Sequence, residues 1–254
     1  MIRTLLIWGL LAGLCGGLLA TGFSELAGEP AVKQAIAFES SSAAAAGEPH
    51  EHAIVSRGVQ RSVGLLTAAI VFGLSMGGLF ALAFAFAYGR VGRASPARTA
   101  LLLAAGAFVV VYLVPFLKYP ANPPSVGDPD TIGRRTELYL AMIVCSLLAA
   151  VAALRIRAWL AARRDPTTAT VVAGLSYLAV VVAAGLILPG IHEVPKNFPA
   201  TTLWRFREAS IGMQAVLWAT IGVIFSVAAQ RVMTGAPVLR RRTAATGLAA
   251  SPGD

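Results

Sequence analysis

The sequence predicts an all-α membrane protein, a polytopic bundle of six transmembrane helices with both termini in the cytoplasm. The chain of 254 residues is 57% hydrophobic and only 13% charged, whereas a soluble domain carries about 25% charged residues. Six apolar runs also reach the length of roughly 20 residues that a helix needs to cross a bilayer. They cover about residues 4–22, 63–88, 99–117, 138–154, 168–188 and 209–230.

The first apolar run has two interpretations. A basic residue precedes it, as in a secretory signal peptide that is cleaved off. However, Gly9, Gly13 and Gly17 recur at every fourth residue, and small residues at that spacing let two helix backbones approach closely. We therefore expect a retained transmembrane helix. Gly73 and Gly77 repeat the spacing in the second run.

The connecting segments indicate the orientation, because cytoplasmic loops of membrane proteins are enriched in Lys and Arg. Segments 89–98 and 155–167 are short and arginine-rich, and most acidic residues fall in the alternate segments. We therefore expect a transmembrane domain over 1–233, with a disordered, basic cytoplasmic tail at 234–254. The net charge of +9 does not indicate nucleic-acid binding, since the basic residues stand between apolar runs and form no continuous patch.

Two of the outer segments are rich in proline. Residues 114–137 cannot form one helix, because proline lacks an amide hydrogen and disfavours helix at the preceding residue. Pro115 and Pro189 are each expected to end a helix. In the first outer segment, GEPAVKQAIAFE (28–39) predicts a short helix with proline in its first turn. The low-complexity stretch SSSAAAAGEPHEH (40–52) is expected to be mobile.

The chemistry is expected in these outer segments, because the six apolar runs contain no Asp, Glu, Lys, Arg or His. That absence argues against a haem bundle, which needs axial histidines inside the membrane. Imidazole and carboxylate groups suit divalent ions such as cobalt, nickel and zinc. The candidate ligands are His50, His52, Asp128, Asp130, His192 and Glu193. A solvated loop, an interfacial cap or turn formation would also account for them.

Arginine and glutamate pairs stand at the predicted starts of the fourth and sixth runs. A carboxylate there would stabilise the positive end of a helix dipole, and the arginines would reach the interface or form ion pairs. Alternatively, the arginines would bind an anionic head group. These residues are Arg134, Arg135, Glu137, Arg205, Arg207 and Glu208.

The order and spacing of four stretches resemble the CbtA family of predicted cobalt transporter subunits over about residues 1–230. The resemblance implies a subunit linked to cobalt supply for cobamide synthesis, in the inner (cytoplasmic) membrane. It also implies a partner, CbtB, a small one-helix protein with a histidine-rich metal-binding segment. It supplies no established ligand set and no permanently bound cofactor. The four stretches are residues 28–39, 56–90, 115–140 and 188–218.

Three hypotheses follow from the sequence. In the first, the chain is a cobalt permease component whose outer carboxylates and histidines capture the ion and whose polar seam passes it inward. In the second, it is a membrane enzyme or anchor subunit that binds an anionic lipid or quinone head group at the outer Arg-Glu sites. In the third, it is a structural subunit without a site of its own.

Overall fold

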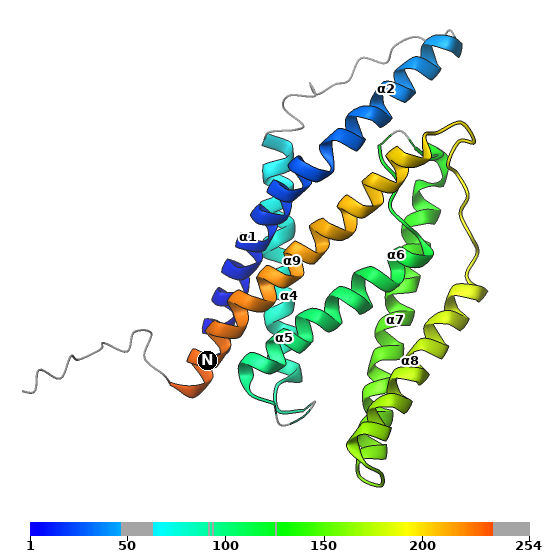
Figure 1. The fold of residues 1–254 in the computed structure, drawn as a ribbon. Coiled ribbons are helices and arrows are strands. Elements are labelled where there is room, and N and C mark those ends of the chain that lie inside the picture. Colours follow the sequence, from blue (N-terminus) through cyan, green and yellow to red (C-terminus); the bar gives the residue numbers. More distant parts are fainter. Residues whose placement is uncertain (47–62, 91, 93, 125, 236–254) are drawn as a thin grey trace, which may run out of the picture.

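A computed structural model describes residues 1–46, 63–90, 92, 94–124 and 126–235 of the chain. The described part is helical and contains no strand (Figure 1). Among the described residues, six helices are long and apolar enough to cross a membrane, as the predicted class and number of spans require. They are α1 (Ile2–Ala27), α4 (Leu65–Ala87), the span Pro96–Lys118, α7 (Ile132–Ala161), α8 (Pro166–Ile187) and α9 (Ala200–Thr234).

Two of these spans begin with the same local chemistry. Ser95 caps α5 (Pro96–Ala107), where its side chain accepts a hydrogen bond from the Arg98 amide. Asp165 caps α8 and accepts one from the Thr168 amide at 2.8 Å. In both helices proline occupies the first position, where its missing amide hydrogen has no intrahelical partner to lose. The short connections before these helices therefore specify where each span starts.

The six spans are arranged as a main bundle and a separate hairpin (Figure 1). In the main bundle α1 packs against both α4 and α9, and α5 packs on another side of α9. The hairpin consists of α7 and α8, and it joins the main bundle chiefly through the span Pro96–Lys118. We call the end of the molecule that carries α2 (Glu29–Ala46) and the segments 119–131 and 188–199 the loop end.

The backbones of α1 and α4 approach each other closely at their glycines. A β-carbon added to Gly9 would lie 2.5 Å from the Gly77 carbonyl oxygen, and one added to Gly17 would lie 2.5 Å from the Ala69 carbonyl oxygen. One added to Gly77 would lie 2.7 Å from the Gly13 Cα. The glycine spacing predicted a close helix contact, and this crossing has that geometry.

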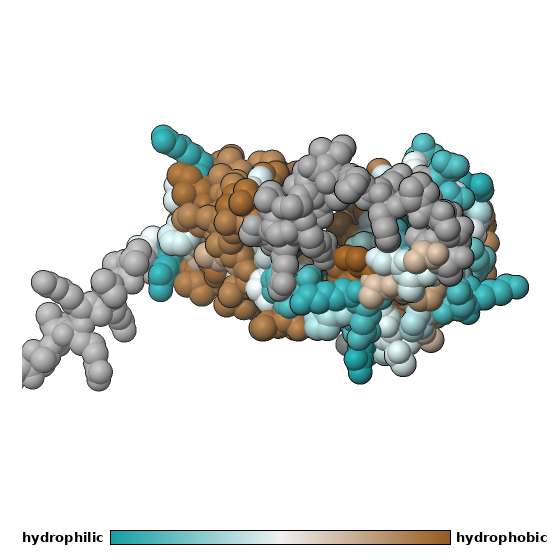
Figure 2. Space-filling model, turned by 90° about the horizontal axis from the view of Figure 1, so that it is seen from above, coloured by the Kyte–Doolittle hydropathy of each residue, from teal (hydrophilic) through white to brown (hydrophobic). Residues whose placement is uncertain are grey.

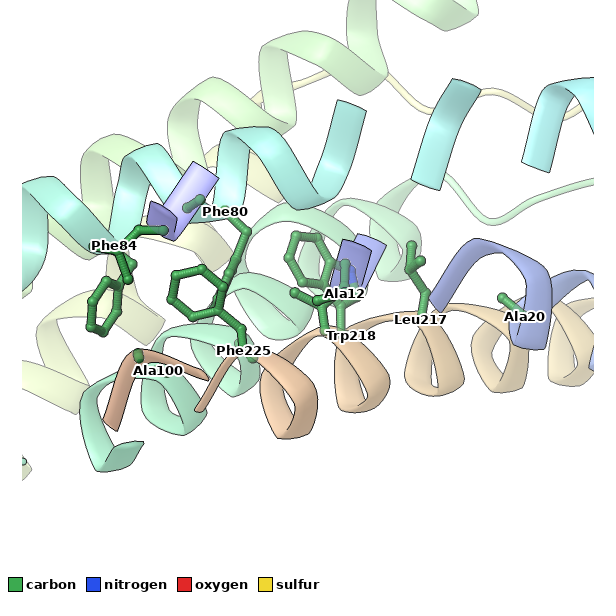
Figure 3. Packing of buried hydrophobic residues seen from close by; sticks show 13 residues of the cluster. Ala12, Ala20, Phe80, Phe84, Ala100, Leu217, Trp218 and Phe225 are labelled. Carbon is green, nitrogen blue, oxygen red and sulfur yellow. The ribbon is translucent and has the colours of Figure 1, made fainter. Parts of the chain in front are cut away.

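Aromatic rings fill the space that α1 leaves between α4 and α9 (Figure 3). The Phe225 ring of α9 lies 5.2 Å from that of Phe80 and 5.1 Å from that of Phe84, both on α4. Both pairs meet edge to face, which is a favourable arrangement for aromatic rings. Phe84 and Phe225 are fully buried, so this cluster fixes the distance between the two helices.

The prediction that Pro115 ends a helix is wrong. The span continues through η2 (Phe108–Leu113), a π-helical stretch, into α6 (Val114–Lys118), and Pro115 lies in the first turn of α6. The wider π turn shifts the hydrogen-bond register upstream, with the Val114 amide donating to the Val109 carbonyl. The proline is thereby accommodated inside the membrane-spanning helix, since a local π-helical adjustment can satisfy the backbone groups that a proline leaves without partners.

Three predicted boundaries also differ from the structure. The helix predicted over 28–39 extends to Ala46 as α2, so the first part of the stretch expected to be mobile is helical. The rest of that stretch, like most of the predicted tail 234–254, lies outside the described residues. α7 and α9 begin at Ile132 and Ala200, earlier than the apolar runs. Polar first turns project beyond the apolar part of each span, and hydropathy alone does not detect them.

The flanks of the molecule are apolar, as expected for contact with lipid. Large hydrophobic side chains on the outside of α4, α7 and α8 are exposed, among them Phe72, Leu148 and Leu175. Viewed from the loop end, the molecule shows brown apolar flanks and teal polar side chains that project at this end (Figure 2). The distribution favours a chain embedded in a bilayer with a polar surface at the loop end.

Candidate functional site

The two proline-rich segments meet at Glu193. Its Oε1 accepts a hydrogen bond of 2.5 Å from the Thr131 hydroxyl. Its Oε2 accepts one of 2.9 Å from Arg135 Nη1, an ion pair, and one of 3.2 Å from the Asp128 amide. We call Glu193, Thr131, Arg135 and Asp128 the Glu193 cluster. It ties segment 188–199 to the start of α7.

A tight turn places the donors of this cluster. The Asp128 carboxylate accepts a hydrogen bond of 3.0 Å from the Asp130 amide, and the Asp128 carbonyl accepts from the Thr131 amide and hydroxyl. Gly127 before it has a φ of 129°, which disfavours any side chain. A β-carbon on Gly127 would also lie 3.1 Å from Glu193 Oε2 and would contact the Arg135 guanidinium. The glycine therefore makes room for the ion pair.

Further contacts join these segments to α9 and α2. Arg207 of α9 donates from Nε to the Ala121 carbonyl at 3.3 Å and from Nη2 to Asn122 Oδ1 at 3.1 Å. The Phe198 ring packs edge to face on Phe38 of α2, with centroids 5.1 Å apart. The loop end is thus a connected cap over the helices, and its segments are held by side chains.

The cluster also stabilises the charged form of Glu193. The hydrogen bond from the Thr131 hydroxyl, with those from the Asp128 amide and Arg135, holds the pKa of Glu193 below its usual value, against the opposing effect of partial burial. Hydrogen bonds to a carboxylate favour its ionised form. The carboxylate is therefore ionised at neutral pH, and it accepts three hydrogen bonds from donors of this chain.

We expect Glu193→Gln to lower the local stability of the loop end at neutral pH and to have little effect on that stability in acid. Because the pKa of Glu193 is lower in the folded protein, its contribution to stability is present above the unfolded pKa of about 4.3 and is lost as the pH falls through the lower folded pKa. Hydrogen exchange of the Asp128 amide, compared between the two proteins from pH 7 downward, measures this.

At pH 7 the variant should exchange this amide severalfold faster, and the difference should shrink below about pH 4.3. The matched control is Glu208→Gln, which removes the charge of an exposed glutamate on α9. A Glu193→Gln difference that persists unchanged into acid would contradict the assignment of a charge-dependent contact.

The structure brings together only part of the predicted metal-binding set. Glu193 and Asp128 meet through the Asp128 amide, whereas His192, Asp128 and Asp130 are exposed. His50 and His52 lie outside the described residues. Within the described ranges, no group of three or more His, Cys, Asp or Glu side chains could hold a metal ion. The predicted ligands that the structure describes are therefore separate polar groups at one end of the molecule and do not form one metal site.

The predicted helix-start role of the Arg-Glu pairs differs from what the structure shows. The first turns of α7 and α9, both fully described, hold no acidic residue, so Glu137 and Glu208 are too far along for the helix dipole to favour them. Arg135 pairs with Glu193 rather than Glu137. Arg134 and Arg205 are exposed. The sequence shows that both segments carry residues of opposite charge, but it does not predict which of these residues form ion pairs.

The fold and the site together define a multi-pass membrane protein. At one end of it, side-chain contacts hold the polar loop segments together. Comparison with protein families then gives the assignment: a family model described as probable cobalt transporter subunit (CbtA) matches residues 2–230. The chain belongs to the CbtA family. No curated protein and no solved structure matches the chain.

Proposed function

We propose that this chain is the membrane subunit of an uptake system for cobalt or a similar divalent transition metal, linked to cobamide supply. The observation that carries the proposal is the family match over residues 2–230, and the six membrane-spanning helices support it. In this proposal cobalt is the transported substrate, the loop end faces outward, and the membrane is the inner (cytoplasmic) one. A small one-helix partner of the CbtB type, with a histidine-rich segment, completes the system.

The capture step is proposed at the loop end. His192, Asp128 and Asp130 are exposed there and can meet an ion from solution. Glu193 already accepts three hydrogen bonds, so we assign it mainly to holding the two segments in place. Imidazole and carboxylate ligands that bind singly give weak, fast capture, which suits a transported ion that must leave again.

The head-group hypothesis is not supported by the family match. Two of the arginines that it requires are engaged within the chain. Arg135 pairs with Glu193, and Arg207 is bonded to Ala121 and Asn122. A guanidinium bound in this way has fewer donors left for an anionic head group.

The test is cobalt accumulation in cells that lack other uptake systems. We expect cells with this chain and its partner to accumulate cobalt well above empty-vector cells. A combined His192→Ala and Asp128→Asn change should lower the initial uptake rate severalfold at limiting cobalt, because both exposed ligands are lost. The control Lys196→Ala changes an exposed residue of the same segment that has no ligand chemistry at neutral pH.

Absence of uptake with the partner present would rule out the proposed function. If the His192 and Asp128 changes left uptake unaltered, the chain would still be a transporter, but these residues would not be the capture site. Arg135→Ala separates the two roles at the loop end, since it breaks the ion pair of 2.9 Å and leaves every candidate ligand in place.

A further inference from the structure

Arginines gather at the end of the molecule opposite the loop end, where α1 begins and α7 turns into α8 (Figure 1). We call it the arginine end. Among the residues that the structure describes there, Asp165 is the only acidic one, and its carboxylate accepts a hydrogen bond of 2.8 Å from the Thr168 amide. All of the described arginines at this end except Arg157 are exposed. They are Arg3, Arg90, Arg98, Arg155, Arg157, Arg163, Arg164 and Arg231.

Two of these arginines lie over an aromatic ring in the same way. The Arg163 Cζ is 4.3 Å from the centroid of the Trp159 ring, and Nη1 donates to the Trp159 carbonyl at 3.1 Å. The Arg90 Cζ is 5.1 Å from the centroid of the Phe86 ring, and Nη1 donates to the Phe86 carbonyl at 2.7 Å. Each contact holds a guanidinium beside the last turn of a membrane-spanning helix, at the depth of the lipid head groups.

Arg163 keeps most of its hydrogen-bonding capacity. A guanidinium has five N–H donors, and within the described ranges the Trp159 carbonyl is the one acceptor that Arg163 uses. The indole ring covers a face of the guanidinium, whereas the donors lie at its edge and match the oxygens of a phosphate. Trp159 is 59% exposed, and its indole N–H is a further donor beside the guanidinium.

An apolar surface leads from these donors toward the membrane interior. Four exposed residues of α7 follow one another at intervals of three or four, so they lie on one face of the helix. From the interior outward they are Leu148, Val151, Arg155 and Trp159. This face offers apolar side chains first, and then a guanidinium and an indole. The order matches an amphiphile with acyl chains and an anionic head, whereas a water-soluble anion would not use the apolar part.

Arg157 has a different role in the same turn. Its Nε donates to Thr170 Oγ1 of α8 at 3.0 Å, and the Thr170 hydroxyl donates to the Pro166 carbonyl at 2.8 Å. These hydrogen bonds hold the first turn of α8 against the end of α7. Arg155 and Arg163 are therefore presented by a hairpin end that is fixed by its own contacts.

We infer that the turn between α7 and α8 binds the phosphate of an anionic phospholipid, with Arg155 and Arg163 as its ligands and the acyl chains along Leu148 and Val151. A zwitterionic phospholipid carries the same phosphate, but the surrounding arginines repel its ammonium group. A head group with net negative charge is therefore preferred, as at other basic clusters next to membrane-spanning helices. The site lies at the end opposite the Glu193 cluster, and it does not depend on which substrate is transported.

The test is native mass spectrometry of the purified full-length chain in a mild detergent, titrated with phosphatidylglycerol or with phosphatidylcholine of the same acyl chains. The first bound phosphatidylglycerol should be held about fivefold more tightly than the first phosphatidylcholine. A combined Arg155→Gln and Arg163→Gln change should remove most of this preference. The matched control is a combined Arg134→Gln and Arg205→Gln change, which removes the same charge from exposed arginines of the loop end and should leave the preference intact.

Three results would overturn the inference: no preference in the wild type, an unchanged preference in the Arg155 and Arg163 variant, or an equal loss in the loop-end control. Glycerophosphoglycerol, the same head group without acyl chains, should not displace the lipid at equal concentration. If it did, the ligand would be a soluble phosphate ester and the inference would be wrong. Should the double variant misfold, as circular dichroism would reveal, Arg155→Gln alone decides, and an unchanged preference overturns the inference.

Discussion

Gly13→Ala should destabilise the protein by about 3 kcal/mol, the upper part of the range for overpacking. The new β-carbon would contact the Gly73 carbonyl and lie 2.7 Å from the Gly77 Cα. Backbone atoms cannot rotate away as a side chain can, so α1 and α4 must separate. The loss should exceed the gain of about 1 kcal/mol that alanine brings in a helix interior.

Unfolding by sodium dodecyl sulfate in mixed micelles, followed by circular dichroism, measures this loss. The matched control is Gly22→Ala in the same helix, since no described atom outside its own helix lies within 4 Å of the β-carbon added there. The control should be neutral or slightly stabilising. Equal stability of the two variants would contradict the close backbone crossing.

Phe225→Ala should cost about 3 kcal/mol, at the low end of the range for buried aromatic truncations. Phe225 is fully buried and contacts Phe80 and Phe84 across the bundle. Lipid is as apolar as the helix surface, so the transfer part of the cost is small inside a membrane. The lost van der Waals contacts and the cavity that remains account for most of the effect.

The control for this change is Phe72→Ala on α4, which removes the same side chain from a position that is 46% exposed. Its effect should be well under half that of Phe225→Ala, because lipid refills the space. The same unfolding measurement serves both variants. If Phe72→Ala proved as costly as Phe225→Ala, the assignment of the lipid-facing and core-facing sides would be wrong.

These packing contacts also matter for the proposed transport. The α1–α4 crossing and the aromatic cluster hold α1, α4 and α9 together, and α9 carries Arg207, which is bonded to the first proline-rich segment. Partial loss of uptake in packing variants therefore has to be compared with their stability.

Much of the architecture follows from composition and spacing. The six apolar runs predicted the six spans, because a helix is the way for a single segment to satisfy its backbone in lipid. The glycines at every fourth residue predicted the close contact that Gly13 makes with α4. The sequence did not reveal the π-helical stretch before Pro115, because no residue pattern marks it. Its wider turn depends on how the hydrogen bonds of the whole span are arranged.

The candidate site depends far more on tertiary structure. Glu193 and Arg135 are 58 residues apart in the chain, and nothing local distinguishes this pairing from Arg135 with Glu137. Arg207 and Asn122 are 85 residues apart in the chain, and their contact is equally invisible in the sequence. Side chains that stand alone in sequence become a site only when helices bring them together.

By itself, then, the sequence determined the class of protein, the number of spans, the glycine-lined helix face and the family resemblance, because each depends on residues within one segment or on their order. Tertiary structure alone decided that Glu193 joins the two proline-rich segments and that the rings of Phe80, Phe84 and Phe225 meet between α4 and α9. Both depend on distances between helices. Those distances are set by packing. The bulk of Phe225 keeps α4 and α9 apart, and the absence of a side chain at Gly13 lets α1 and α4 come close.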